Sequence, residues 1–363
     1  MVEFNINTEG IEVVNAFPSQ VSGKTFLITG PSEGGVGAET ALSLAHGSPS
    51  TILLLGRDNA KIQPTIDAIA KLNPSINVKF IPIDLTSFFS VRTAATTILS
   101  DTSIPKIDYL INNAAIMAAP YALTVDGYES QLQTNHLSHF LLTNLLLSSS
   151  KLTSTAKIIN VSSAAHMTSD IRYESTDFEK GEKYVQWYAY GQSKTANLLF
   201  TTELNKRFKE KGLKLRSFAP TPGAADSKLS RFVTEEMREQ GMKAWIAAGR
   251  GPMVRKSLQQ GAASYLRAAL DPSLLEQDLV FIDNCQPVAV SPTELSAYAV
   301  DEENAKKLWA LSEEMVGEKF ECTLRHLLNP NNTTPQPLMS RDPLPKPPHN
   351  LLLNTFLSHH PLL

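Results

Sequence analysis

The sequence predicts one large α/β domain, built on a single doubly wound parallel sheet with helices on both faces. Short apolar runs recur along the chain, and such uninterrupted runs are typical of strands buried on both faces of a parallel sheet. Segments with helical periodicity lie between them, and strands that alternate with helices form βαβ units with right-handed crossovers. A cluster of glycines follows the first apolar run, where a turn from strand to helix is expected.

The alternation contains seven expected strands and five expected helices. The strands are Thr25–Thr29, Thr51–Leu55, Asn77–Ile83, Ile107–Ile111, Lys157–Val161, Lys214–Phe218 and Leu279–Ile282. The helices are Ala38–Ala45, a segment that starts after Asp58, Thr86–Leu99, Asp126–Leu147 and Tyr188–Lys211. Asp58 is expected to cap its helix, and the helix over 126–147 is expected to be long and amphipathic.

The domain is expected to span residues 23–320, because no change in composition marks a second domain before residue 320. Residues 1–22 are expected to form a loose N-terminal arm, and residues 228–255 a lid. The remaining residues, 321–363, carry eight of the 22 prolines of the chain. Proline at that density prevents regular helix or sheet, so a flexible tail is expected, with a docking motif as the alternative.

The composition favours a cytoplasmic protein without nucleic-acid partners. The net charge is only −3, whereas a nucleic-acid-binding surface needs a basic stripe. Cys285 and Cys322 cannot supply a disulfide framework or a structural zinc site, and no metal is expected. The N-terminus lacks the apolar core of a signal peptide. The most apolar stretch, Leu137–Leu147, is too short to span a bilayer, so no membrane anchor is expected.

The glycine cluster predicts a dinucleotide site of the Rossmann type. The segment TGPSEGGVG, Thr29–Gly37, follows a strand and opens a helix. Glycines there permit a tight turn and let a pyrophosphate approach the backbone, while the helix N-terminus presents free N–H groups to the anion. The alternative is an ordinary turn between strand and helix, and the position in the first βαβ unit favours the cofactor.

The end of the second strand favours NADP over NAD. NAD sites usually place a carboxylate at that position to bind the ribose 2′-hydroxyl. Here Gly56 ends the strand and Arg57 follows, and a guanidinium can bind a 2′-phosphate with paired donors. Lys61 adds a second positive charge one helical turn later. Asp58 and Glu33 weaken this interpretation, and the alternative for Arg57 is a solvated surface arginine.

Tyr190 and Lys194 predict an acid–base pair. They are four residues apart in YGQSK, which places both on one face of a helix. A free tyrosine has a pKa of about 10. A nearby ammonium is expected to lower that pKa and so make the phenol a usable general acid or base. Ser162 and Ser163 follow the strand before this helix, at the edge where ligands of such sheets bind. Asn135 lies mid-helix, where asparagine is unfavourable, with a solvent-facing role as the alternative.

Taken together, these motifs make the chain resemble the short-chain dehydrogenase/reductase family. The motifs occur along the chain in the same order as in that family: TGPSEGGVG, Asp84 in PIDLTS, NNAA, Asn135, NVSS, YGQSK and PTPGAADS. The resemblance covers roughly Lys24 to Phe320 and is nearest to the retinol-dehydrogenase-like branch and to fungal reductases of small-molecule biosynthesis. It departs from the family pattern in a glycine turn that is one residue longer, so that the glycine in the middle role is undecided. NNAA also replaces NNAG, and Ser227 stands for a threonine.

The resemblance implies a role for each matching residue. Tyr190 would donate or accept the proton, Lys194 would lower its pKa and hold the ribose, and Ser163 would position the substrate oxygen. Asn135 would support a proton-relay water. The cofactor, NADP(H), would contact Gly30, Ser32, Gly35, Val36 and Gly37 at the pyrophosphate, Arg57 and Lys61 at the 2′-phosphate, Asp84 and Leu85 at the adenine, and Asn112, Tyr190, Lys194, Pro222 and Gly223 near the nicotinamide.

The expected activity is interconversion of a carbonyl and an alcohol on a small organic substrate. Apolar candidates in the lid, which suggest a bulky apolar substrate or simply pack the lid helices, are Phe232, Met237, Met242, Trp245 and Met253. A non-catalytic NADP(H)-binding regulator is one alternative, and an epimerase or dehydratase that uses the same tyrosine is another. A homo-oligomer is left open.

Overall fold

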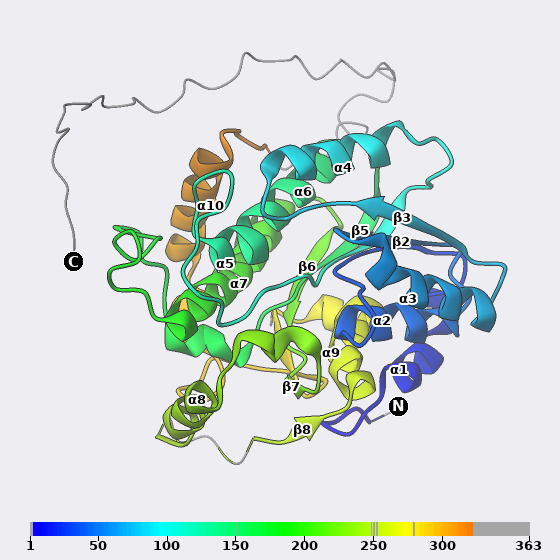
Figure 1. Ribbon diagram of the computed structural model, residues 1–363. Coiled ribbons are helices and arrows are strands. Elements are labelled where there is room, and N and C mark those ends of the chain that lie inside the picture. The colour runs from blue at the N-terminus through cyan, green and yellow to red at the C-terminus, as the bar shows by residue number, and fades with distance from the viewer. Residues whose placement is uncertain are drawn as a thin grey trace, which may run out of the picture.

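The computed structural model describes residues 3–149, 151–247, 249, 251, 253–278 and 280–321 (Figure 1). An eight-stranded sheet runs through its centre in the order β10-β9-β6-β5-β4-β1-β2-β3. The strands are β1 (Thr25–Thr29), β2 (Thr51–Gly56), β3 (Asn77–Pro82), β4 (Ile107–Asn112), β5 (Leu152–Asn160), β6 (Arg216–Pro220), β9 (Phe281–Asp283) and β10 (Gln286–Pro287). The predicted doubly wound α/β fold is confirmed.

Every neighbouring pair in the large sheet is parallel except β9 and β10. The order of the strands reverses between β1 and β4, and a crevice for ligands opens beyond the strand ends at such a switch point. The strand expected at Leu279–Ile282 is found at β9, although Leu279 itself lies outside the described residues.

Helices cover the two faces of the sheet in separate groups, as Figure 1 shows. On one face lie α1 (Gly10–Ala16), α2 (Val36–Ala45), α3 (Asn59–Leu72) and α9 (Leu258–Leu270). On the other lie α4 (Phe88–Ser100), α6 (Ser138–Leu147), α7 (Gln186–Glu210) and α10 (Glu302–Val316). Asp58 caps α3 as predicted, accepting a hydrogen bond from the Ala60 amide at 2.9 Å.

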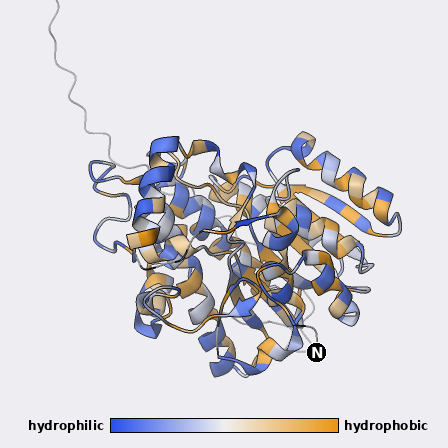
Figure 2. Ribbon diagram, turned by 90° about the horizontal axis from the view of Figure 1, so that it is seen from below, coloured by the Kyte–Doolittle hydropathy of each residue, from blue (hydrophilic) through white to orange (hydrophobic). Residues whose placement is uncertain are grey.

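Side chains of β1 supply both cores in turn. Leu27 packs into the core beneath α4, α6 and α7, whereas Phe26 and Ile28 pack beneath α2 and α9. This alternation follows from the two-residue repeat of a strand, and burial on both faces explains why the strand reads as a continuous apolar run. Along the outer helices, hydrophilic and hydrophobic residues are mixed (Figure 2).

The segment over 126–147 differs from the expected amphipathic helix. It is helical only from Ser130, beginning with α5 (Ser130–Leu132), and a π-helical stretch, Gln133–Leu137, separates α5 from α6. It is buried almost all round, with Asn135, His136 and His139 among its interior residues. The reason is its position, since α4 packs on one side of it while α7 and α10 cover its π-helical stretch.

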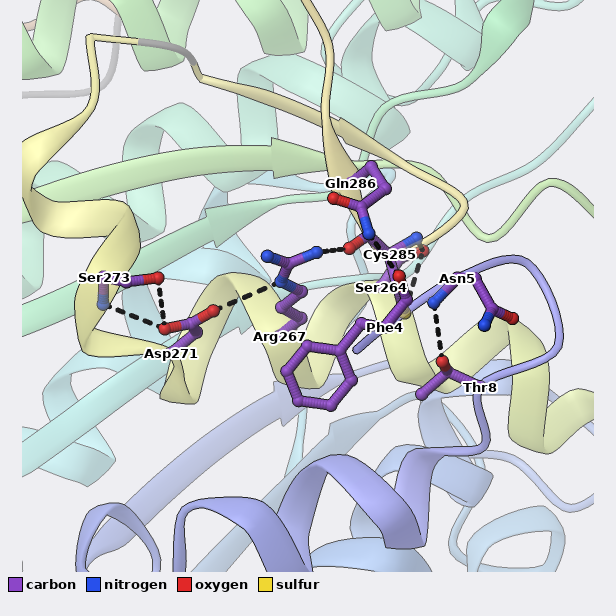
Figure 3. A network of polar contacts seen from close by, with 9 residues as sticks. All are labelled: Phe4, Asn5, Thr8, Ser264, Arg267, Asp271, Ser273, Cys285 and Gln286. Carbon is purple, nitrogen blue, oxygen red and sulfur yellow. Dashed lines mark hydrogen bonds and ion pairs between the residues drawn. The ribbon is translucent and has the colours of Figure 1, made fainter. Parts of the chain in front are cut away.

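The expectation of a loose N-terminal arm is wrong. Val13 and Val14 of α1 are buried against α9. Figure 3 shows how the start of the chain is held: Arg267 of α9 lies over the Phe4 ring at 5.0 Å and donates to the Cys285 carbonyl, and Gln286 donates to the Phe4 carbonyl. The first residues described therefore form part of the core.

Strand β3 is one of the two edges of the sheet and pairs with β2 only. Its side chains are mostly half-exposed. Lys79 projects from it and makes an ion pair with Asp101 at 2.6 Å, which holds the pKa of that carboxyl well below its usual value. Pro82 ends the strand.

Among the described helices, none is long and apolar enough to cross a membrane. Within the same residues, His, Cys, Asp and Glu side chains form no group of three or more that could hold a metal. Cys322 and the proline-rich segment after Glu321 lie outside the described residues.

Candidate active site

The glycine turn connects β1 to α2 at the switch point. Gly30 has a left-handed φ of 69°, and a β-carbon there would lie 2.8 Å from the Ala114 Cα. A β-carbon at Gly37 would overlap the Asn113 Nδ2 atom and lie 2.8 Å from the Gly30 carbonyl oxygen. Only glycine fits these two positions without displacing backbone or a bonded side chain.

The lengthened turn places Gly35 immediately before α2. Gly35 is the N-cap residue of that helix, and its amide donates to the Ser32 carbonyl at 3.1 Å. Gly34, just before it, is left-handed with a φ of 73°. Val36 begins the helix, so its first N–H groups face the crevice side, where an anion would be stabilised. Gly35 is therefore the glycine at the helix N-terminus.

A hydroxyl and an amide join the ends of β1 and β4. The Thr29 Oγ1 atom accepts from the amides of Asn113 and Ala114, both at 3.0 Å. The Asn113 side chain donates to the Thr29 carbonyl at 2.8 Å. These bonds hold the ends of β1 and β4 together beside the glycine turn, and sequence reasoning had singled out neither Thr29 nor Asn113.

The residues predicted to contact the adenosine half lie at the ends of β2 and β3. Arg57 is exposed directly after β2, and Lys61 is exposed and lies 3.8 Å from Asp58. Asp84 accepts from the Thr86 amide and hydroxyl at 2.9 and 2.8 Å. The Leu85 carbonyl accepts from Ser138 of α6 at 2.6 Å. All four residues border the same edge of the sheet.

Tyr190 and Lys194 lie on α7 and are 4% and 2% exposed. The Lys194 ammonium donates to the Val161 carbonyl at 2.9 Å and lies 5.6 Å from the centre of the Tyr190 ring. The Ser162 hydroxyl donates to the Lys194 carbonyl at 2.9 Å. Ser163 follows β5, and its side chain is close enough to Tyr190 to lower the pKa of the phenol. The predicted pair and both serines are thus brought together.

Burial controls the protonation of this pair. It raises the pKa of Tyr190 to about 12, with Ser163 opposing it, and it lowers the pKa of Lys194 to about 7. The expectation that the ammonium lowers the pKa of the phenol is therefore not met. The cause is that desolvation disfavours the charged form of both groups.

Asn135 lies in the π-helical stretch, where the Ser138 amide donates to the Gln133 carbonyl instead of the carbonyl four residues back. Its side chain accepts from the Ile116 amide and donates to the Ile116 carbonyl and to Ser193, each at 2.9 Å. Ser193 in turn donates to the Tyr190 carbonyl at 2.7 Å. Asn135 is buried, which removes the solvent-facing alternative, and it links the strand-β4 loop to the tyrosine helix.

His139 connects the two halves of the site, and sequence reasoning missed it. Its Nδ1 lies 3.1 Å from the Asn135 carbonyl oxygen and its Nε2 lies 2.9 Å from the Thr29 hydroxyl. Because a carbonyl only accepts, Nδ1 carries the proton, and Thr29 must donate to Nε2. Burial lowers the pKa of His139 to about 4, which keeps it neutral. The signal was a histidine inside a strongly apolar run.

Asn112 occupies a different place from the one predicted. It is buried, and its Nδ2 donates to Thr143 at 3.0 Å and to Asn160 at 2.8 Å. It therefore joins β4, β5 and α6 inside the protein, and its expected contact with a cofactor gains no support. The neighbouring Asn113 holds the glycine turn instead.

Pro222 and Gly223 follow β6, and Gly223 has a left-handed φ of 66°. After them come β7 (Ala224–Ala225), a 3-10 helix (Lys228–Phe232) capped by Ser227, α8 (Glu235–Ala247) and β8 (Arg255–Lys256). Strands β7 and β8 pair and close the base of this predicted lid.

The lid is attached to the tyrosine helix through Trp187. Its indole donates to the Met237 carbonyl at 3.3 Å, and its ring packs edge-on against Tyr190, with centroids 6.3 Å apart. Of the apolar candidates, Met237 and Trp245 are half-buried. Partial exposure remains at Phe232, Met242 and Met253. An apolar surface therefore lies on the segment next to the tyrosine.

A glycine turn at the switch point, with a buried tyrosine–lysine pair beside it, defines a nucleotide-binding oxidoreductase of the Rossmann type. The chain belongs to the short-chain dehydrogenase family, whose model, described as "short chain dehydrogenase", matches residues 24–238. It acts on CH–OH groups or the corresponding carbonyls of a small substrate, and its family uses NAD(P)(H).

Curated relatives agree with this assignment. Short-chain dehydrogenase/reductase prx1 of Penicillium roqueforti is 38% identical over 81% of this chain and 85% of its own. Human retinol dehydrogenase 13 is 34% identical, covering 83% and 88%. A solved structure from Mycobacterium paratuberculosis has a TM-score of 0.60 and 35% identity, covering 82% and 95%.

Proposed function

We propose that this protein interconverts a carbonyl and an alcohol on a small apolar substrate with NADP(H), using Tyr190 as proton donor and acceptor. The observation that carries the proposal is the buried Tyr190 hydroxyl, placed near Ser163 and beside Lys194 at the edge of the sheet where ligands bind. A phenol that is held protonated in a dry site can supply a proton to a substrate oxygen.

The glycine turn fits a dinucleotide. The spaces at Gly30 and Gly37 admit no side chain, and the N-terminus of α2 suits a pyrophosphate. When bound, the nicotinamide donates or accepts the hydride. Arg57 supports NADP because it stands exposed at the end of β2, where an NAD site would carry a carboxylate. Lys194 would hold the nicotinamide ribose, and Gly223 would lie against the ring.

Four polar side chains of the protein have separate roles in the proposed reaction. Ser163 orients the substrate oxygen, and the Tyr190 O–H donates its proton as that oxygen gains negative charge. In oxidation, Tyr190 accepts the proton of the alcohol. Lys194 donates to the Val161 carbonyl. In its protonated form, Lys194 stabilises the Tyr190 phenolate. Asn135 holds the neighbouring loop through Ile116 and Ser193.

The lid and the relatives support an apolar substrate. Methionine and aromatic side chains lie on the segment beside Tyr190. The curated relatives include proteins named retinol dehydrogenases, and retinol is an apolar alcohol. We further propose that the enzyme is cytoplasmic and serves small-molecule biosynthesis. Its similarity to a Penicillium protein supports a fungal setting.

Replacement of Tyr190 by phenylalanine tests the proposal. NADPH oxidation with a panel of apolar ketones and aldehydes should fall by about 10²- to 10⁴-fold in Tyr190→Phe, while NADPH binding, measured by fluorescence, should persist. Tyr188→Phe is the matched control, because Tyr188 lies on the same helix and is 48% exposed. Undiminished turnover in Tyr190→Phe would contradict the mechanism.

Two other results would point to different functions. Tight NADPH binding without turnover of any carbonyl would indicate a regulator. A product formed without net NADPH consumption would indicate an epimerase or a dehydratase.

A further inference from the structure

A lysine of the lid segment stands over the glycine turn. A β-carbon at Gly34 would lie 3.2 Å from the Lys228 Cε and 3.4 Å from its Nζ. Lys228 begins the 3-10 helix that Ser227 caps, and its side chain is otherwise exposed. The ammonium is thus held near the turn between β1 and α2 although the two segments are far apart in sequence.

Arg231 lies one turn along the same 3-10 helix, which begins over the glycine turn. The glycine turn contacts the start of α3, because the Glu33 amide donates to the Lys61 carbonyl at 3.1 Å. Arg57 lowers the pKa of Arg231, after the larger effect of burial. The Arg231 guanidinium also lies 4.7 Å from the centre of the Phe232 ring, which limits where it can point. Two guanidinium groups that approach each other repel, and a bound anion would remove that repulsion.

These three cations have no acidic partner among the residues that the structure describes. In the described part of the chain, no carboxylate lies within 4.0 Å of Arg57, Lys228 or Arg231. The nearby Asp58 pairs with Lys61 instead, and Glu33 is the acidic side chain of the turn itself. The edge of the crevice thus presents unneutralised positive charge from two separate segments.

We propose that Lys228 and Arg231 complete the phosphate site of the dinucleotide from the lid side. Lys228 binds the pyrophosphate, because it stands over the turn that cradles this group in either nicotinamide nucleotide. Arg231 binds the 2′-phosphate together with Arg57, since two guanidinium forks suit a dianion. This assignment rests on the proposed use of NADP(H), and it makes Arg231 a specificity-determining residue.

Titration calorimetry with NADPH and with NADH separates the two roles. Arg231→Met should raise the dissociation constant for NADPH about tenfold, which corresponds to about 1.4 kcal/mol, and leave that for NADH within about twofold of the native value. Lys228→Met should weaken both nucleotides about equally, by about tenfold. Arg57→Met serves as the comparison for Arg231, and Lys71→Met, exposed near the end of α3, as the neutral control.

The outcomes distinguish this inference from the proposed function. A native preference for NADPH that Arg231→Met and Lys228→Met leave unchanged would overturn the inference alone. Equal weakening of NADPH and NADH by Arg231→Met would overturn its assignment to the 2′-phosphate. A native protein that binds NADPH no more tightly than NADH would overturn the proposed cofactor preference as well.

Discussion

Gly37 shows how one missing side chain shapes the nucleotide crevice. In Gly37→Ala, the new methyl group would meet the Asn113 side chain and the Gly30 carbonyl, so that Asn113 would lose its bond to the Thr29 carbonyl. We expect NADPH affinity, measured by calorimetry, to fall about tenfold or more. Gly212→Ala is the control: Gly212 has a left-handed φ but open space around it, so stability should fall without a change in affinity.

His139 is expected to position the site through its two bonds. Asn at this position would reach only one partner, so we expect His139→Asn to lower kcat/KM about fivefold, since one hydrogen bond contributes about 1 kcal/mol. His136→Asn is the comparison, because His136 bonds to Ser312 of α10 and not to Thr29 or Asn135. Both variants should unfold at lower temperature. Equal kcat/KM values for the two variants would argue against a positioning role for His139.

The site was predictable where a residue type alone carries the chemistry. Tyr190, Lys194, Ser163 and the glycine turn are recognisable because their spacing and order along the chain are specific. The roles of Thr29 and Asn113 depend on contacts between strand ends, which no local pattern reveals. Asn112 and Asn113 show the limit most clearly. Asn112 ends β4 and bonds to Asn160 inside the protein, Asn113 just after it bonds to the Thr29 carbonyl, and only the structure separates them.

At the scale of elements, α1 is expected to stabilise the whole domain. Val13 is fully buried between α1 and α9, so Val13→Ala should lower the free energy of unfolding by about 2 kcal/mol. Chemical denaturation would measure this. Val290→Ala, at a position that is 52% exposed, should have little effect. An unchanged denaturation midpoint for Val13→Ala would mean that the packing of α1 does not contribute to the stability of the domain.

Seven strands were predicted, and most of their ends lie within about two residues of the observed ones, because burial on both faces leaves a clear apolar run. The short strands β7, β8 and β10 were not predicted. Helices α1, α9 and α10 were not predicted. Helix α1 has only seven residues, and its capping box of Glu9 and Glu12 was its one local signal. Helix α10 carried stronger signals, with Asp301 as N-cap and the left-handed Gly317 after its end. The π-helical stretch has no such local signature.

For the whole molecule, acid stability should depend on two buried histidines. Burial lowers the pKa of His136 to about 3 and that of His139 to about 4, against an ordinary 6.5. As the pH falls from 6.5 towards these lowered pKa values, the two histidines bind protons in the unfolded chain but not in the folded protein. The free energy of unfolding therefore decreases. We expect the melting temperature to drop between pH 6.5 and 4, and to drop less in His136→Asn/His139→Asn. Replacement of the exposed His46 should leave the slope unchanged.

The free edge at β3 has a consequence for behaviour at high concentration. A bare outer strand offers its backbone groups to any other chain and so invites aggregation. Here the ion-paired Lys79 places charge on that margin, and Pro82 offers no N–H at its end. At the opposite margin, the short antiparallel β10 leaves little backbone to extend. Both margins therefore resist strand addition by a neighbouring molecule, which favours a protein that remains dispersed.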